Sequence, residues 1–355
     1  MLFIDGSYGE GGGQVLRTSL SLSMITGLTF RIRHIRASRP KPGLRPQHLA
    51  CVKAAAKVCG ARVQGATIGS PEILFQPGRI KPGRYRFAIG TAGSTGLLFQ
   101  TLALPLAFAD GPSELLLEGG THVPWSPCYH YLKEVYLPAL SAMSINMDIR
   151  LLKWGFYPKG GGRMLAAIEP APPSGPFCTS APDAPPKRVR GLSATARLPE
   201  HIRIRQAESA ASILERHGLA TEFILEEADA DSPGTLAFVW IREKARLLGA
   251  ASLGRRGKPA EEVGRDAALE LLKPLTAGAC CDRHLSDQLL LPAALSIKAS
   301  TWTTDAVTSH FKTNAWVTSR FLSCRIEYKE LASGGCAIRV SPAHFSFGKE
   351  SWAMD

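Results

Sequence analysis

The chain has 355 residues, and 45% of them are apolar, which suffices for about two domains with a hydrophobic core. Lys and Arg exceed Asp and Glu by 42 to 30, giving a formal net charge of +12, which fits a polyanionic partner and equally a merely basic surface. No apolar run reaches the roughly 18 residues of a membrane span, and the first residues lack the basic and apolar segments of an export signal, so we expect a cytoplasmic protein with no membrane partner.

The cysteines give no sign of a metal site. None of the eight forms a CxxC pair, and no His lies at zinc-finger spacing from them. In a chain of this length and class we expect reduced, mostly buried thiols.

Strands and helices alternate from the first residue onward. A strand at 2–4 leads through a glycine-rich turn into a helix at 14–26, and a strand at 30–35 leads into a second helix between Pro46 and Gly60. The further elements expected before residue 170 are strands at 72–75 and 85–89, a helix ending at Leu104, a strand at 114–118, a helix at 127–143, and strands at 147–152 and 163–168. The recurrence of strand, glycine turn, helix and strand predicts repeated α+β units.

A second, smaller unit is expected after a segment rich in Pro, Ser and Ala at 171–188. It would contain strands at 191–197, 221–226 and 235–241, and helices at 205–217 and 259–272. The predicted fold class is therefore α+β: a large domain, 1–179 with 279–355, built of repeated units of a β-sheet and two helices, and a small α/β domain inserted at 180–278.

The first candidate site is the turn from Gly6 to Gly13, which has five glycines in eight residues directly before a helix. Such a turn lets the backbone approach a ligand, and the helix start offers free N–H groups to an anion. Glu10, Gln14 and Arg17 lie close by, so a phosphate site with a carboxylate for a divalent ion is chemically sensible. A plain strand-to-helix turn explains the glycines alone as well, and neither GxxxxGK[ST] nor GxGxxG occurs here.

The second candidate is the loop from Arg36 to His48, which contains four basic side chains and three prolines. Arginine forks pair with phosphate oxygens, and prolines reduce the entropy that a loop loses on binding. A phosphate site is favoured over a solvated basic loop. The later glycine loop GFYPKGGGR at 155–163 fits an ordinary hairpin turn equally well.

Two candidates lie near the C-terminus. His284, Leu285, Ser286, Asp287 and Gln288 open an apolar helix, and Asp287 and Gln288 are placed in its first turn, where acids commonly cap a helix. His310 lies among hydroxyl groups and beside Lys312. A lone His is more often structural, although a neutral imidazole can attack phosphorus when a neighbour fixes its tautomer.

These motifs together resemble the RNA 3′-terminal phosphate cyclases. The resemblance is carried, in the family's order, by DGSYGEGGGQVLRTSLSLSMITG, IRASRPKPGLRPQHL, GTAGSTGLLFQTL, GFYPKGGG, HLSDQLLLPAAL and SHFKTN. It implies an ATP-dependent reaction in which a histidine takes AMP, passes it to an RNA 3′-phosphate, and the vicinal 2′-OH then closes a 2′,3′-cyclic phosphate and expels AMP. It also implies the two-part fold expected above.

The resemblance assigns roles to individual residues. His310 matches the nucleophile, and Glu10 matches a residue near a divalent cation, Mg²⁺ or Mn²⁺, and the ATP phosphates. The matched ATP contacts are Gln14, Gln100, Pro127 and His284 to Gln288, with Pro127 and His284 as the two walls of an adenine slot. The matched polar cluster for phosphates and the RNA end is Arg17, Arg36, Arg39, Gln47 and His48. Asp287 would either orient or charge-balance the histidine or help hold the adenosine.

Two departures from familiar patterns matter. Family members often carry an aromatic residue such as Tyr where this chain has His284, which can still stack on adenine. The lysine of the KxDG motif of common ligases is replaced by Phe3, so a lysine adenylate is not expected.

Two other classes of protein remain as alternatives. Cyclase-like proteins of ribosome biogenesis share the fold and bind RNA without catalysis, but they depart from the nucleophile motif that this chain keeps. Sugar-nucleotide or enolpyruvyl transferases have similar repeated units, and they need no nucleotide on a histidine. The expected partner is RNA with a 3′-terminal phosphate, and a homodimer is held open.

Overall fold

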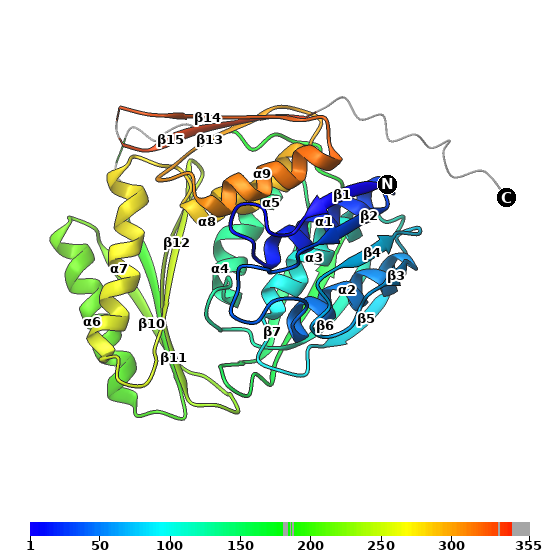
Figure 1. The fold of residues 1–355 in the computed structure, drawn as a ribbon. Coiled ribbons are helices and arrows are strands. Elements are labelled where there is room, and N and C mark those ends of the chain that lie inside the picture. The colour runs from blue at the N-terminus through cyan, green and yellow to red at the C-terminus, as the bar shows by residue number, and fades with distance from the viewer. Residues whose placement is uncertain (180–183, 185, 187, 333, 343–355) are drawn as a thin grey trace.

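The structure is a computed structural model that describes residues 1–179, 184, 186, 188–332 and 334–342 (Figure 1). Helices alternate with strands that form several small sheets, so the predicted α+β class is confirmed. Part of the expected linker, and the expected boundary at residue 180, fall on residues 180–183, 185 and 187, which lie outside the described ranges.

The first two sheets repeat one arrangement of strands. The first unit consists of β1 (Leu2–Asp5), α1 (Gly13–Thr26), β2 (Phe30–Arg33), α2 (Pro46–Cys59), β3 (Arg62–Gln64) and β4 (Ile73–Gln76), with the sheet order β1-β2-β4-β3. The second consists of β5 (Arg84–Ala88), α3 (Thr95–Ala107), β6 (Ser113–Gly119), α4 (Tyr129–Tyr131), a π-helical turn (Leu132–Tyr136), α5 (Leu137–Ala142), β7 (Met147–Lys153) and β8 (Gly162–Ile168), ordered β5-β6-β8-β7. In each sheet the first two strands are parallel and the others antiparallel.

A third unit follows the same plan near the C-terminus. It contains α8 (Arg283–Ala294), β13 (Ser300–Thr304), α9 (Ser309–Phe321), β14 (Arg325–Glu330) and β15 (Cys336–Ser341), and its sheet order is β13-β15-β14. The segment 177–179 runs parallel to β13, because Thr301 N donates to Phe177 O at 2.9 Å and Thr179 N donates to Thr301 O at 3.0 Å. This segment occupies the place of the first strand in the other two units.

The remaining sheet lies between 179 and 279 in the sequence. Its elements are β9 (Val189–Ala196), α6 (Glu200–Arg216), β10 (Thr221–Glu227), β11 (Gly234–Glu243), β12 (Arg246–Leu253) and α7 (Ala260–Thr276), with the order β10-β9-β11-β12. One face forms its own apolar cluster with α6 and α7, while Leu192, Phe238 and Trp240 on the other face join the main core. The arrangement supports the division into 1–179 with 279–355 and 180–278, which stays a prediction.

Helix α1 lies at the centre of the large part and packs against α2, α3 and α9 (Figure 1). Its buried serines allow this because small side chains permit close approach and each hydroxyl finds a carbonyl: Ser19 Oγ donates to Val15 O, Ser21 Oγ to Thr101 O and Ser23 Oγ to Leu28 O. Pro105 has no N–H to donate to the Thr101 carbonyl, and the Ser21 hydroxyl donates to it instead. Helix α3 continues through Pro105 to Ala107, whereas the prediction ended it at Leu104.

Several predicted bounds were wrong. Helix α6 begins at Glu200 rather than 205, directly after Pro199. The segment expected as a helix at 127–143 is helical from 129 to 142, with a π-helical turn in its middle. Strand β12 was missed because its Leu, Ala and Gly residues have weak strand preference, and its pairing with β11 decides its conformation. Within the described residues, no helix is long and apolar enough to cross a membrane.

Candidate active site

The glycine turn between β1 and α1 is shaped by backbone that only glycine adopts easily. Gly9 and Gly11 have φ of 60° and 58°, and Gly12 precedes α1 without giving it a side-chain cap. A Cβ on Gly13 would lie 2.2 Å from His48 Nε2, so the basic loop approaches the helix start closely. The first N–H groups of α1 therefore point into a polar site with no protein side chain capping them.

His310 lies in the first turn of α9 and meets this glycine turn. Its Nε2 is 2.6 Å from Glu10 Oε2, and its Nδ1 contacts Gln14 Oε1. Both partners are oxygen acceptors, so the two ring nitrogens donate at the same time only when the ring carries both protons. The imidazole side chain remains 45% exposed, which leaves it accessible to a ligand.

Asp287 holds the orientation of Gln14. Gln14 Nε2 donates to Asp287 Oδ1 at 3.1 Å, which turns the amide oxygen toward His310 Nδ1. Asp287 Oδ2 is 3.8 Å from the same nitrogen. Burial raises the pKa of Asp287, and the His310 imidazole and the amide hydrogen bonds offset part of that rise.

Asn314 completes this cluster, although it was not among the residues predicted from the sequence. Asn314 Nδ2 donates to Asp287 Oδ1 at 3.2 Å and to the Asp287 carbonyl at 3.1 Å, and Thr18 Oγ1 donates to Asn314 Oδ1 at 2.8 Å. Asn314 lies four residues after His310, on the same face of α9. That spacing could have identified it.

Glu10 connects His310 with the basic loop. Its Oε1 accepts from Arg39 Nη2 at 2.5 Å while its Oε2 faces His310, and its backbone N donates to Thr313 Oγ1 at 3.3 Å. Both carboxylate oxygens are thus engaged by positively charged or protonated groups. Glu10 therefore lies at the centre of a cluster that it forms with Arg39 and His310.

Arg17 and His48 lie behind the glycine turn. A Cβ on Gly13 would be 2.8 Å from Arg17 Nη1 as well as touching His48. Burial and the positive charges of neighbouring arginines lower the pKa of His48 to about 3, so its imidazole is neutral near pH 7. Its buried Nδ1 has no hydrogen-bond partner among the described residues.

Arg36 and Gln47, the other two residues of the predicted phosphate cluster, form hydrogen bonds with the protein's own backbone. Arg36 Nη1 donates to Lys41 O at 2.6 Å and to Gly43 O at 3.2 Å, which holds the loop closed on itself. Gln47 Oε1 accepts from Ser94 N at 3.2 Å and so links α2 to the turn before α3. Neither side chain joins the hydrogen-bonded cluster around His310.

The start of α8 differs from its prediction. The cap is Asp282, which accepts from His284 N at 2.9 Å and Leu285 N at 3.0 Å, whereas Asp287 lies in the second turn and caps nothing. Leu285 is fully buried, and Ser286 accepts from Trp302 Nε1 at 2.9 Å, so these two side chains face the core.

The predicted adenine slot is spread over separate elements. His284 is exposed and Gln288 is part-buried, with a buried Oε1 that has no partner among the described residues. Pro127 precedes Cys128, the cap of α4, and Tyr131 in α4 donates to Asp282 at 2.8 Å, which ties the Pro127 segment to the start of α8. Gln100 lies part-buried in the second turn of α3.

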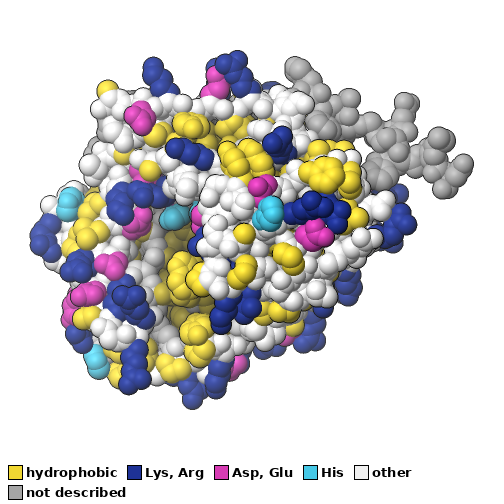
Figure 2. All heavy atoms as spheres, in the orientation of Figure 1, with side chains coloured by type: hydrophobic (Ala, Val, Ile, Leu, Met, Phe, Trp, Pro, Cys, Tyr) yellow, Lys and Arg dark blue, Asp and Glu magenta, His cyan; other side chains and the backbone are white. Residues whose placement is uncertain are grey.

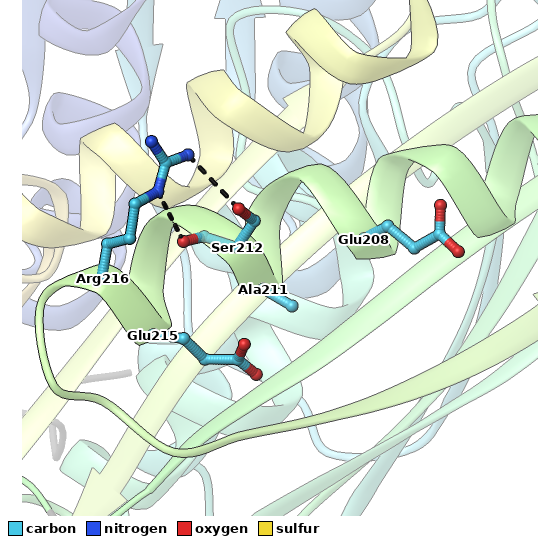
Figure 3. A pocket seen from close by; sticks show the side chains of 5 residues that line it. All are labelled: Glu208, Ala211, Ser212, Glu215 and Arg216. Atoms are coloured by element: carbon cyan, nitrogen blue, oxygen red, sulfur yellow. Dashed lines mark hydrogen bonds between the residues drawn. The ribbon is translucent and has the colours of Figure 1, made fainter.

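Neither a metal-binding cluster nor the pocket on α6 adds a second candidate site. Among the described residues, no group of three or more His, Cys, Asp or Glu side chains could hold a metal ion. The pocket in Figure 3 lies along α6, where Arg216 bonds back to Ser212, and none of the predicted site residues lines it. Lys and Arg side chains are spread over the whole face seen in Figure 2.

Comparison with known proteins identifies the family. A family model described as "RNA 3'-terminal phosphate cyclase" matches residues 8–328. The chain is 44% identical to the "RNA 3'-terminal phosphate cyclase" of Archaeoglobus fulgidus, covering 93% of this chain and 98% of that protein. It is 40% identical to the protein of the same name from Methylococcus capsulatus, covering 96% of each. The chain therefore belongs to the RNA 3′-terminal phosphate cyclase family, as its motifs predicted.

Among solved structures, the enolpyruvyl transferase NikO from Streptomyces tendae aligns with 60% of this chain and 38% of its own, at 18% identity and a TM-score of 0.28. A similarity this weak supports no conclusion about fold or function.

Proposed function

We propose that this protein converts an RNA 3′-terminal phosphate to a 2′,3′-cyclic phosphate with ATP, through AMP carried on His310. Relatives of nearly full length are named RNA 3′-terminal phosphate cyclase. The observation that carries the residue assignment is the arrangement of Glu10, Gln14 and Asp287 around the exposed His310 imidazole.

Glu10 and Gln14 would prepare His310 for attack. Glu10 Oε2, at 2.6 Å, is placed to take the proton from Nε2, which leaves a lone pair on that nitrogen. Gln14 keeps the other proton on Nδ1, and Asp287 supports the positive charge that grows on the ring as the Nε2–phosphorus bond forms and pyrophosphate leaves.

The uncapped start of α1 fits the phosphates of ATP. Its free N–H groups and Arg17 together supply donors and positive charge where a Cβ would crowd the site. His284 and Pro127 would hold the adenine, and Gln100 and Gln288 would contact the nucleotide.

A divalent cation fits only as an ion bound jointly by protein and substrate. Glu10 is the carboxylate that contacts both Arg39 and His310 Nε2, and Mg²⁺ is commonly held by one or two carboxylates together with substrate phosphates. The ion would replace one of the two contacts of Glu10 and neutralise phosphate charge.

Arg39 would serve the second half of the reaction. Its guanidinium, on the exposed basic loop, can pair with the RNA 3′-phosphate beside the adenylated histidine. The RNA phosphate then takes AMP, and the 2′-OH closes the ring as AMP leaves. Gln47, His48 and Arg36 would support this loop.

The alternative function is that of a non-catalytic RNA-binding factor in ribosome biogenesis. Incubation with α-labelled ATP and Mg²⁺ or Mn²⁺, followed by peptide mapping, separates the two. We expect acid-labile, alkali-stable AMP on the peptide that contains His310, and no label on His310→Ala. Full labelling of that variant would refute the assignment, and an unlabelled wild-type protein would favour the binding factor.

A further inference from the structure

Three side chains form a stack next to the candidate active site. The rings of Tyr8 and Trp316 lie parallel, with centroids 4.0 Å apart and planes 13° apart, and Arg320 Cζ lies 5.3 Å from the Trp316 centroid. A ring at 4.0 Å leaves no space for a guanidinium on the same side, so Arg320 covers the opposite face of Trp316. The order is Arg320, Trp316, Tyr8, and the outer face of Tyr8 is the free end.

The stack is joined directly to the catalytic cluster. Tyr8 lies in the glycine turn two residues before Glu10, and the Glu10 backbone N donates to Thr313 Oγ1 on α9. Thr313 is one turn after His310 and one turn before Trp316. At about 1.5 Å per residue, Trp316 is roughly 9 Å along the helix from His310, a distance that the last nucleotides of an RNA strand can span.

Trp316 packs against the main core, but core packing does not account for Tyr8. The buried pair Phe30 and Phe75 is wholly inaccessible, whereas Tyr8 is 44% exposed and sits among glycines that offer no side chain to cover it. Within the described ranges, no other ring and no cation is found over Tyr8. An exposed aromatic face beside basic side chains is the arrangement that single-stranded nucleic acids use for stacking.

We propose that Tyr8 is a stacking platform for a base at the 3′ end of the RNA. This rests on the proposed function, because the 3′-phosphate must lie at Arg39 and His310. Trp316 backs the Tyr8 ring, and Arg320 fixes Trp316 and adds positive charge for the RNA backbone. Stacking of this kind accepts any base, so the platform would bind an RNA end independently of its sequence.

The test measures RNA binding in the absence of ATP. A short RNA with a 3′-phosphate and 2-aminopurine at the last or second-last position should lose fluorescence on binding the wild-type protein. Tyr8→Leu should abolish that quenching and weaken binding about 5-fold or more, as expected for loss of one base–aromatic stack, while Tyr8→Phe should retain both. Tyr328→Leu is the matched control, since Tyr328 is 49% exposed and lies on β14.

The labelling of each variant by α-labelled ATP is measured in parallel. The platform is supported when RNA affinity falls at least 5-fold more than labelling in Tyr8→Leu. Wild-type quenching and affinity in Tyr8→Leu would overturn it, and so would an equal loss of labelling, because the stack would then only hold the glycine turn against α9. A wild-type protein that takes no label but shows Tyr8-dependent quenching would refute the cyclase proposal and leave the platform standing.

Discussion

Replacing Asp287 with asparagine tests whether its negative charge stabilises the positive charge that develops on His310 during attack. The substitution keeps the size of the side chain and removes its negative charge. Asp287 lies 3.8 Å from His310 Nδ1 and orients Gln14, whose amide oxygen contacts the same nitrogen. The new amide can still accept from Gln14, so the change acts mainly on the positive charge that develops on the imidazole.

The size of the effect follows from this geometry. Two unit charges 3.8 Å apart attract by about 4 kcal/mol at an effective dielectric constant of about 20. Because the His310 side chain is 45% exposed, water screens much of this. The range of roughly 1.5–3 kcal/mol for a hydrogen bond to a charged group is the better guide. It corresponds to a rate about 10- to 150-fold lower for transfer of AMP to the protein.

Single-turnover labelling with α-labelled ATP at several ATP concentrations separates this rate from the affinity for ATP. Glu226→Gln is the matched control, since Glu226 is a part-buried carboxylate bonded to Trp154 Nε1 at 3.1 Å, with a pKa raised by burial. A labelling rate within 2-fold of wild type for Asp287→Asn would refute the reasoning. A large loss of ATP affinity with an unchanged rate would instead assign Asp287 to the adenosine.

Further predictions concern stability and the second half-reaction. Asp282→Ala should lower the free energy of unfolding by about 2–4 kcal/mol in urea titrations, because its buried carboxylate accepts from Tyr131, Gly249 and the first N–H groups of α8. His48 has a folded pKa of about 3 against 6.5 when exposed, so the unfolded chain binds more protons between these values and stability falls as pH drops from about 6.5 to 3. His48→Asn should flatten that fall, and an unchanged slope would contradict it. Arg39→Ala should slow transfer of AMP to RNA more than self-labelling; equal losses would assign Arg39 to ATP.

The repeated units were predictable where their helices end at a clear local signal. Gly27 and Gly60 end α1 and α2 in the left-handed conformation, as their sequence positions indicated. The elements that were missed lack such signals. The strand β12 depends on β11 for its conformation, and the third sheet takes its first strand from residues 177–179, about 100 residues before the rest of its unit.

For the site, the sequence supplied the residues and the structure supplied their pairing. Glu10, Gln14, Asp287 and His310 were all candidates, but only the packing of α1 against α9 shows that Gln14 lies between Asp287 and His310. The role given to Asp287 as a possible cap was wrong because Asp282, five residues earlier, is bonded to the first N–H groups of α8. Two acids in one short segment cannot be told apart by charge alone.

The repeated units place most of the predicted site residues at the starts of helices, which is where phosphates bind well. Apart from Glu10, Arg36, Arg39 and Pro127, every predicted site residue lies in the first two turns of α1, α2, α3, α8 or α9. Under the proposed function, the positive ends of these helix dipoles would therefore face the ligand. Side chains of Ser94, Asp282 and Thr308 cap α3, α8 and α9, whereas α1 and α2 have no side-chain cap. The start of α1 lies beside Arg17 and Arg39, so under the proposed function negative phosphate charge is best placed there, and the capped start of α8 is better suited to the uncharged adenosine.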